Sequence, residues 1–327
     1  MKYRKLAGTS MEVSEVSFGC WTLGGLNWVN GTANGWANVD EDEVLAGIKA
    51  GIDAGVNHFD NADVYGNGRA ERVLSGALKR LGVSSHDFII ATKVGHFPGT
   101  ADHAYEAGHI RSQLEQSLRN LKRDYVDIFY FHHADFGPED RYLPEAVATM
   151  DALIKEGKVR IKGQSAYSDE QFEHIVPLVR PQVLQTWANI LDDKFIRPGS
   201  RMDQLMEREN LSLVAFAPLA KGLLLDKYNP AKPPTFEAGD TREGREEFQS
   251  ESLAKLKPKV EKLKARFGAT TEDLAGVAIN YVLNNPHVAC VIPGFRNEKQ
   301  ARCNLAGAGR VLTAADIDFI REVFAEA

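Results

Sequence analysis

The chain has 327 residues and 43% hydrophobic content, enough to bury the core of one large α/β barrel or of two smaller domains. Its 39 basic and 45 acidic side chains give a net charge of −6 and are mixed along the sequence. Because the sequence has no stripe rich in lysine and arginine, we expect neither a nucleic-acid partner nor a polybasic membrane contact.

The cysteines and the N-terminus indicate where the protein resides. Cys20, Cys290 and Cys303 are scattered and form no CxxC pair, so we expect a reducing compartment and neither a disulfide framework nor a metal site. The N-terminus lacks the apolar core of a signal peptide, and no apolar run approaches the roughly 18 residues of a membrane helix. These features predict a cytoplasmic protein.

The N-terminal part divides into a hairpin and a loop. Residues 2–19 predict a small β-hairpin, and 14–19 can supply the first strand of a larger sheet. Residues 20–39 are rich in Gly, Asn and Trp and lack periodicity, so we expect a long irregular loop, which in compact domains is usually functional. A helix follows, with Asp40 as its expected N-cap.

Short apolar runs then alternate with amphipathic segments. The expected strands are 57–60, 88–92, 126–131, 158–163, 182–186, 211–216 and 288–292. The expected helices are 69–81, 108–122, 143–157, 169–179, 202–210, 250–267 and 271–284. Such alternation is typical of βαβ units with a parallel sheet. With 14–19 these strands number eight, which favours a (β/α)8 TIM barrel formed by residues 1–327 as a single domain, with extra helices before strand eight. A doubly wound open sheet is the alternative.

The alternation breaks once, between residues 219 and 250. This segment holds three prolines, several glycines and many charges. It follows the seventh expected strand and therefore emerges at the face where a barrel enzyme binds its ligands. We interpret it as a lid over a bound ligand; a plain surface excursion is the alternative.

Four polar residues stand at or just beyond the ends of expected strands: Asp60, Tyr65, Lys93 and His132. Each alone has an ordinary structural interpretation, such as a helix cap, an ion pair or a core histidine. In a TIM barrel, however, the active site lies where the strands end, so all four should meet at one rim.

Together these residues suit an acid catalyst. A tyrosine has a pKa of about 10, and a neighbouring ammonium lowers it. We expect Lys93 to supply that cation, Asp60 to hold Lys93 charged, and His132 to bind the oxygen on which negative charge develops. The arrangement suits protonation of a carbonyl oxygen while a hydride reaches the carbon. Because no side chain delivers a hydride, a cofactor is required.

Seven segments of the chain carry a resemblance to a known family. They are FGCWTLGG, FDNADVYGNGRAE, ATKVG, YVDIFYFHH, GKVRIKGQS, AFAPLAKGLL and VIPGFRNEKQARCNL. In order and spacing they resemble the aldo-keto reductases, from about residue 3 to 306. The short C-terminus and the segment NEKQARCNL look closer to the bacterial and potassium-channel β-subunit-like branches than to the aldose reductases. The resemblance implies a TIM barrel that binds NADP(H), less often NAD(H), without a Rossmann fold, in agreement with the absence of GxGxxG.

The resemblance also implies roles for individual residues. The catalytic tetrad falls on Asp60, Tyr65, Lys93 and His132, with Tyr65 as the general acid/base. Positions that match cofactor-binding residues of the family are Trp21, Ser165, Gln185, Phe216, Pro218, Leu219, Lys221, Gly294, Arg296, Gln300 and Asn304. Candidates for the substrate pocket are Trp21, Trp28, Phe97, His133 and Trp187, although Trp187 is also interpretable as core packing.

The chain departs from the family pattern at several positions. Ala166 replaces the usual Asn after Ser165, Asn61 the usual Thr, and Cys303 a Glu that often contacts adenine. Gly294 stands where some relatives have a lysine for the 2′-phosphate, which leaves Arg296 as the best cation for it. We therefore favour NADP over NAD and expect weaker binding or a different set of contacts.

Three functions are compatible with these residues. The first is an enzyme that interconverts an aldehyde or ketone with its alcohol. The second is a cofactor-binding regulatory subunit of a larger assembly. The third, an aldolase that forms a Schiff base through Lys93, is disfavoured because Asp60 would keep that lysine protonated. Small-molecule substrates are expected, but an aromatic pocket suits sugar-derived, aromatic and steroid carbonyls equally. The oligomeric state is open.

Overall fold

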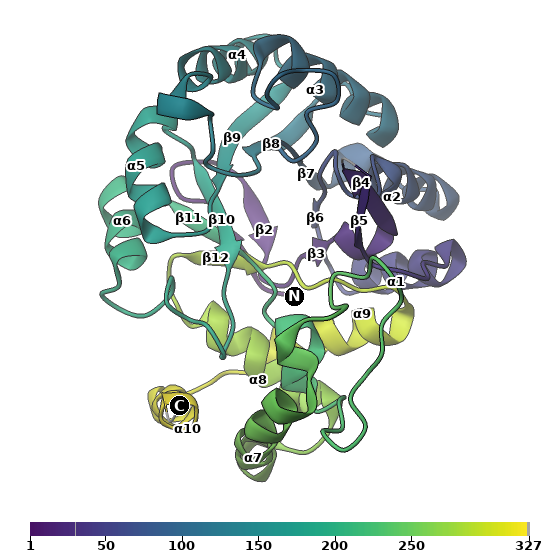
Figure 1. Cartoon of the computed structure of the whole chain (residues 1–327), viewed down its shortest axis with the longest axis vertical. Coiled ribbons are helices and arrows are strands. Elements are labelled where there is room, and N and C mark those ends of the chain that lie inside the picture. The colour runs from purple at the N-terminus through teal and green to yellow at the C-terminus, as the bar shows by residue number, and fades with distance from the viewer. Residues whose placement is uncertain (30, 326–327) are drawn as a thin grey trace.

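The computed structural model describes residues 1–29 and 31–325 and contains an eight-stranded parallel barrel (Figure 1). The barrel strands, in chain order, are β3 (Phe18–Gly19), β6 (His58–Asp60), β7 (Ile89–Val94), β8 (Val126–Phe131), β9 (Val159–Ser165), β10 (Val183–Trp187), β11 (Ser212–Phe216) and β12 (Val288–Val291). Parallel bridges from Val16 to Val291 and from Gly19 to Gly294 join the two ends of the sheet. The TIM barrel is therefore confirmed, and the open sheet is wrong.

Helices surround the strands (Figure 1). They are α1 (Glu41–Asp53), α2 (Arg69–Leu81), α3 (Ala107–Leu121), α4 (Leu143–Lys155), α5 (Asp169–Val179), α6 (Arg201–Glu209), α7 (Ser250–Phe267), α8 (Thr271–Leu283), α9 (Glu298–Leu305) and α10 (Ala314–Ala325). The last two were not expected from the sequence. The side chain of Asp40 caps α1 as expected, and Thr270 and Asp273 form a capping box on α8.

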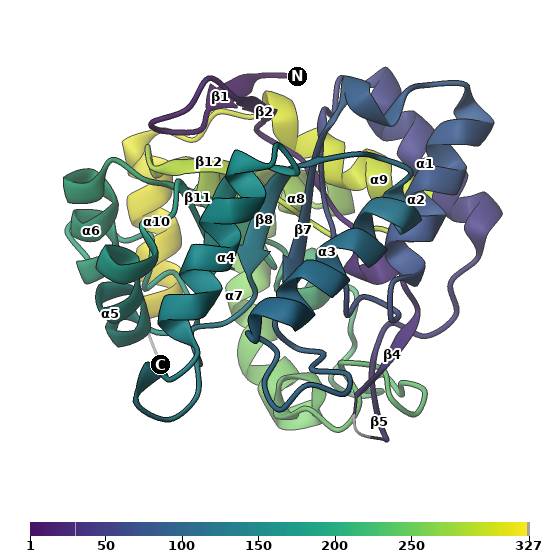
Figure 2. The same ribbon diagram turned by 90° about the horizontal axis from the view of Figure 1, so that it is seen from above.

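The two ends of the barrel carry different hairpins (Figure 2). The expected N-terminal hairpin is confirmed as β1 (Tyr3–Lys5) paired with β2 (Glu12–Ser14). It lies at the amino ends of the strands, because the backbone N–H of Ala7 donates to Ser212 Oγ at 2.8 Å and Arg4 Nη1 donates to the Val288 carbonyl at 2.9 Å. This hairpin therefore lies away from the predicted catalytic rim.

The segment expected to be an irregular loop, residues 20–39, instead contains a 3-10 turn at Trp21–Leu23 and a second antiparallel hairpin. Its strands are β4 (Leu26–Val29) and β5 (Thr32–Gly35). The expectation was wrong because partners distant in sequence stabilise the hairpin: Gly35 N–H donates to the Gly239 carbonyl at 3.0 Å, and Thr241 N–H donates to the Gly35 carbonyl at 2.7 Å. Tertiary contact thus orders a segment with no periodicity of its own.

We call this contact the clasp and define it as residues 26–29 and 31–38 packed on residues 236–242. The second half belongs to the segment after β11 that the sequence singled out, so that segment is attached to the hairpin rather than free (Figure 2). The guanidinium carbon of Arg242 lies 4.7 Å from the ring centroid of Trp36 and 4.3 Å from that of Phe236. The clasp therefore joins the loop after β3 to the loop after β11 at the carboxyl ends of the strands.

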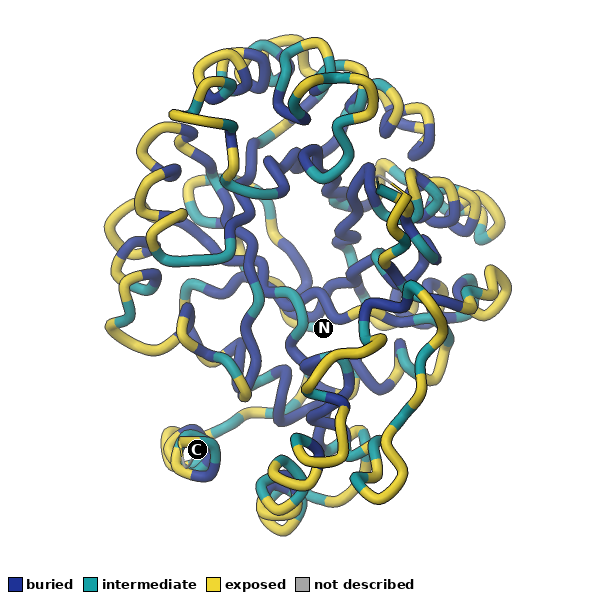
Figure 3. Tube along the Cα trace, in the orientation of Figure 1, coloured by how far each residue is buried: buried dark blue, intermediate teal, exposed yellow. Residues whose placement is uncertain are grey.

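Burial follows the barrel architecture (Figure 3). One apolar cluster fills the barrel interior and includes Val13, Ile128, Val183 and Cys290. Two larger clusters lie between the strands and the helices. Within the described residues, no helix combines the length and the apolar character that crossing a membrane requires.

Candidate active site

Strand β6, the loop that follows it and strand β7 bring an ion pair and a tyrosine together. Lys93 on β7 donates hydrogen bonds from Nζ to Asp60 Oδ2 at 2.6 Å, to the Asn61 carbonyl at 2.7 Å and to Tyr65 Oη at 3.2 Å. An ammonium has three N–H donors, and each of them has an acceptor here. Lys93 and Asp60 are fully buried, so this hydrogen bonding is what makes burial of the charged pair tolerable.

Further side chains fix the tyrosine and the aspartate. Tyr65 stacks on Trp21 with ring centroids 5.9 Å apart, and it lies 5.8 Å from His132 in an edge-on arrangement. Gln185 on β10 donates from Nε2 to the other oxygen of Asp60 at 2.9 Å. The four residues that the sequence placed at one rim therefore lie together, and Gln185 adds a contact to Asp60 that sequence reasoning did not foresee.

The electrostatics of Tyr65 differ from the sequence expectation. Burial, with the charge of Asp60 next, raises the pKa of Tyr65 well above its usual value of 10, although the Lys93 ammonium lies 3.2 Å away. Burial also lowers the pKa of Lys93, against the opposing charge of Asp60. The expected lowering of the Tyr65 pKa is therefore wrong. Tyr65 is held as the neutral phenol, which is the form that donates a proton.

His132 follows β8 and is held neutral. Burial, followed by nearby His96 and Lys93, lowers its pKa well below 6.5. Its Nδ1 is buried without a hydrogen-bond partner. A buried N–H without an acceptor costs more than an unpaired lone pair on a ring nitrogen, so the proton belongs on Nε2. His132 can then donate from Nε2 to an oxygen in the barrel mouth.

Not every predicted substrate residue is free to make polar contacts. Both ring nitrogens of His133 are engaged by backbone groups: Nε2 with the Gly95 carbonyl at 2.9 Å and Nδ1 with the Asp135 N–H at 3.2 Å. Trp187 donates from Nε1 to Asp192 Oδ2 at 2.6 Å and packs on Phe195 and Phe216. These two residues present ring surface rather than hydrogen-bonding groups.

The remaining candidates for the pocket wall lie near the mouth. Trp28 lies on β4 and its side chain is 56% exposed. It is therefore a surface aromatic near the barrel mouth and not part of a buried pocket wall. Phe97 follows β7, and its carbonyl accepts a hydrogen bond from His109 at 2.7 Å. Trp21 is the candidate in direct contact with Tyr65.

Predicted cofactor residues occupy the ends of β9 to β12. Ser165 ends β9 and pairs with Gln185 in the middle of β10, and both are buried; Phe216 ends β11, with Pro218 and Leu219 after it. The ammonium of Lys221 pairs with Glu247 at 2.8 Å.

The loop after β12 is shaped by the residues expected to bind adenosine. Asn304 donates to the Gly294 carbonyl at 3.1 Å, and Gln300 Oε1 accepts from the Arg296 N–H at 2.9 Å. A Cβ at Gly294 would come within 2.6 Å of Thr22 Cγ2, so this position needs glycine for close approach. These contacts give Asn304 and Gln300 a structural role in shaping the loop.

Several basic side chains lie beside this loop, and their surroundings indicate whether the site suits a phosphorylated dinucleotide. Arg296 donates to the Ala37 carbonyl at 3.0 Å, and burial together with the charge of Arg242 lowers its pKa. Partial burial and the cations Arg296 and Arg242 likewise lower the pKa of Lys227. Arg242 is paired with Asp240 at 2.8 Å, which leaves Arg296 and Lys227 beside this loop as the cations that favour an anionic ligand, so the residues present fit a nicotinamide dinucleotide.

Two residues near the tetrad were missed by sequence reasoning. His96 follows β7 and its ring lies 4.4 Å from that of His132, and Tyr167 follows β9 and donates to the His132 carbonyl at 3.2 Å. The signal that could have found them is the one used for the tetrad, a polar side chain just beyond a strand end.

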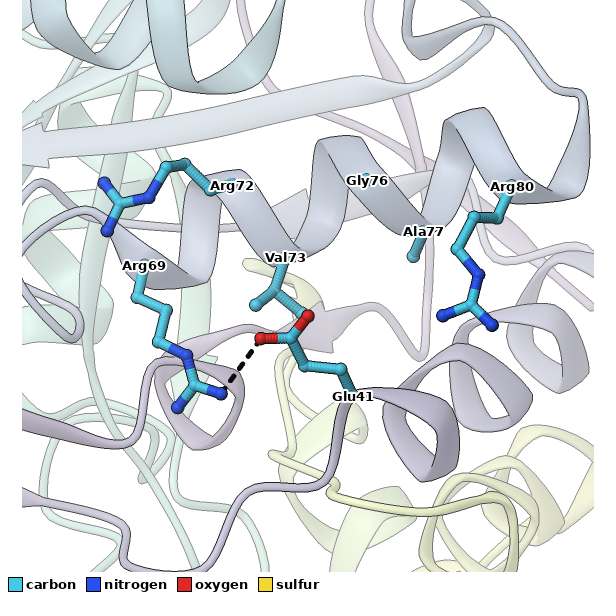
Figure 4. A pocket seen from close by; sticks show the side chains of 7 residues that line it. All are labelled: Glu41, Arg69, Arg72, Val73, Gly76, Ala77 and Arg80. Atoms are coloured by element: carbon cyan, nitrogen blue, oxygen red, sulfur yellow. Dashed lines mark hydrogen bonds and ion pairs between the residues drawn. The ribbon is translucent and has the colours of Figure 1, made fainter.

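Another groove lies between α1 and α2, on the outside of the barrel (Figure 4). Its arginines are largely compensated, since Arg69 pairs with Glu41 at 3.0 Å and Arg80 pairs with Asp42 at 2.8 Å. Within the part of the chain that the structure describes, no group of three or more His, Cys, Asp or Glu residues is arranged to hold a metal ion.

Comparison with known proteins agrees with this geometry. A sequence profile of the Aldo/keto reductase family matches residues 15–325. A rice (Oryza sativa subsp. japonica) protein named "Probable voltage-gated potassium channel subunit beta" is 31% identical over 338 residues, covering 99% of this chain and 96% of the relative.

Two solved structures are similar over nearly the whole chain. The glycerol dehydrogenase AKR11B4 from Gluconobacter oxydans has a TM-score of 0.80 at 25% identity, covering 99% of this chain and 95% of its own. The holo form of the aldo-keto reductase AKR11C1 from Bacillus halodurans has a TM-score of 0.77 at 26% identity, covering 99% and 96%. The chain therefore belongs to the aldo/keto reductase family, which supports NAD(P)H-dependent carbonyl oxidoreduction as its general chemistry.

Proposed function

We propose that this protein is an NADP(H)-dependent oxidoreductase that interconverts an aldehyde or ketone with its alcohol, and that Tyr65 exchanges the proton. The observation that carries the proposal is the set of three hydrogen bonds made by buried Lys93, one of which ends on Tyr65 Oη. This arrangement places a neutral phenol beside a fixed cation at the rim where a barrel enzyme binds its substrate.

A bound reduced nicotinamide supplies the hydride. Tyr65 would donate its phenolic proton to the carbonyl oxygen, which gains the C=O π electron pair as the carbonyl is reduced to the alcohol. The phenolate left on Tyr65 lies 3.2 Å from the Lys93 ammonium, which stabilises its negative charge until a solvent proton restores the phenol. Asp60 keeps Lys93 positioned, and His132 donates from Nε2 to the same oxygen as negative charge develops.

The preference for NADP(H) rests on Arg296, assisted by Lys227, because Arg242 is already paired with Asp240. A guanidinium suits a phosphate dianion because it donates two parallel hydrogen bonds. We therefore expect NADPH to bind more tightly than NADH in a fluorescence titration. Arg296→Ala should weaken NADPH binding about tenfold or more and NADH binding much less. If the variant weakened NADPH and NADH binding equally, Arg296 would not be the residue that binds the 2′-phosphate.

The proton role is tested by Tyr65→Phe, which keeps the ring on Trp21 and removes only the hydroxyl. We expect kcat for carbonyl reduction to fall about 10²- to 10⁴-fold while NADPH binding persists. Tyr125→Phe, outside the barrel mouth, is the matched control. A Tyr65→Phe variant with wild-type turnover would show that another group donates the proton.

A second candidate function is a regulatory subunit, favoured by the name of the rice relative. It would bind the cofactor, turn over slowly and associate with a partner. Native mass spectrometry of the protein purified from its source, combined with turnover rates, distinguishes the two. Fast turnover by a protein without a partner excludes this candidate.

The Schiff-base alternative has less support, because all three Nζ donors of Lys93 are engaged and its Asp60 partner lies 2.6 Å away. A reducing, cytoplasmic location remains part of the proposal. It is supported by Cys20, Cys290 and Cys303, which are all free and buried.

A further inference from the structure

His96 lies beside the proposed proton-transfer site, but the proposed mechanism gives it no role. It follows β7 by two residues and is half-buried at the barrel mouth. Its ring centroid lies 4.4 Å from that of His132 and 4.9 Å from that of His133. A substrate held by His132 therefore lies within reach of His96.

The hydrogen bonds of Tyr167 determine which nitrogen of His96 carries the proton. The Tyr167 hydroxyl donates its single proton to the His132 carbonyl at 3.2 Å. It also lies 3.1 Å from His96 Nε2, and both contacts are hydrogen bonds when the hydroxyl oxygen accepts from Nε2–H. The ring is neutral, because burial and the nearby His133 and Lys93 lower its pKa to about 4. His96 Nδ1 is therefore an unprotonated acceptor.

Nδ1 of His96 is also accessible. Among the described residues no protein atom bonds it, and it is not one of the buried atoms left without a partner. The same holds for Nε2 of His132, assigned above as a donor. The mouth thus presents a donor on one imidazole and an acceptor on the adjacent one.

We propose that His96 is a specificity-determining residue that accepts a hydrogen bond from a hydroxyl on the carbon next to the reacting carbonyl. The substrate class is then the α-hydroxy aldehydes and ketones, in which the carbonyl oxygen accepts from His132 and the neighbouring hydroxyl donates to His96. This inference rests on the proposed oxidoreductase function and narrows its substrate. Tyr167 is a positioning residue, because it fixes the proton of His96 on Nε2.

The test compares two aldehydes that differ by one hydroxyl, 2-hydroxypropanal and propanal, with NADPH as the reductant. The measured quantity is the ratio of their kcat/KM values. We expect the wild-type protein to favour 2-hydroxypropanal. His96→Phe, which keeps a ring without nitrogen, should lower the ratio about threefold to tenfold, the effect of one hydrogen bond between uncharged groups.

Two amide variants separate the nitrogens. His96→Asn places a polar atom near the position of Nδ1 and should keep most of the preference, whereas His96→Gln places one near Nε2 and should lose it. Propanal turnover reports that each variant is folded and active. A wild-type ratio near one, or a wild-type ratio in both His96→Phe and His96→Gln, would overturn the role of His96. If the wild-type protein reduced neither aldehyde nor any other carbonyl tried, the proposed function itself would fail.

Discussion

The tetrad and the clasp lie at the same end of the barrel but are built differently. Asp60 and Lys93 lie on neighbouring barrel strands, are fully buried and are joined at 2.6 Å. The clasp joins two loops through two backbone hydrogen bonds and a partly exposed arginine between aromatic rings. The proposed reacting groups are thus fixed by buried contacts, whereas the clasp is held by partly exposed contacts that open at lower cost.

The largest effect should come from breaking the buried ion pair. Lys93→Met leaves Asp60 charged and without its cation, which should cost about 3–5 kcal/mol of unfolding free energy in urea denaturation. The double variant Asp60→Asn with Lys93→Met removes both charges and should recover most of that loss while remaining inactive. A single variant as stable as wild type would mean that the pair is not charged in the folded protein.

A large pH effect should come from His58, buried in the barrel below Asp60. Burial lowers its pKa to about 4. The unfolded chain therefore binds the proton first as the pH falls, so stability is present above about pH 6.5 and is lost between 6.5 and 4. The loss should reach roughly 3 kcal/mol at the acid end. His58→Leu should make the stability–pH curve less steep over this range, with the remaining slope due to His132 and His96, whose pKa values are also lowered. An unchanged slope would exclude His58 as a source.

The clasp should respond more weakly. Arg242→Ala removes the cation between Trp36 and Phe236 and the two hydrogen bonds to Asp240, at 2.8 Å each. We expect a stability loss of about 1 kcal/mol, because these contacts are only partly buried. NADPH should dissociate faster in stopped-flow fluorescence. Unchanged dissociation would mean that the clasp does not cover the cofactor.

The smallest effect should come from the surface pair Lys49–Asp53 on α1, whose side chains are 59% and 57% exposed. Lys49→Ala should change the unfolding free energy by less than about 0.5 kcal/mol and leave turnover unaltered. This variant is the baseline for the other three. A loss as large as that of Arg242→Ala would remove the contrast between the clasp and an ordinary surface contact.

Much of the architecture was predictable because its signals are local. Asp40, the apolar strands and the amphipathic helices are set by side-chain periodicity and capping, which act over a few residues. Parallel βα units place strand ends at one rim, so Asp60, Lys93 and His132 could be expected to converge.

Tertiary structure decided the remaining features, because each depends on contacts between distant segments. Gly35 pairs with residues about 200 positions later, which turns an aperiodic stretch into a hairpin. Desolvation outweighs the nearby Lys93 and raises the pKa of Tyr65, a balance that no spacing in the sequence reveals. Likewise, only the packed loops show that both ring nitrogens of His133 are already hydrogen-bonded, whereas His132 Nε2 and His96 Nδ1 are neither buried nor bonded to another described residue. Sequence determined which residues meet at the rim. Packing determined their protonation states and which of their hydrogen-bonding atoms remain available to a substrate.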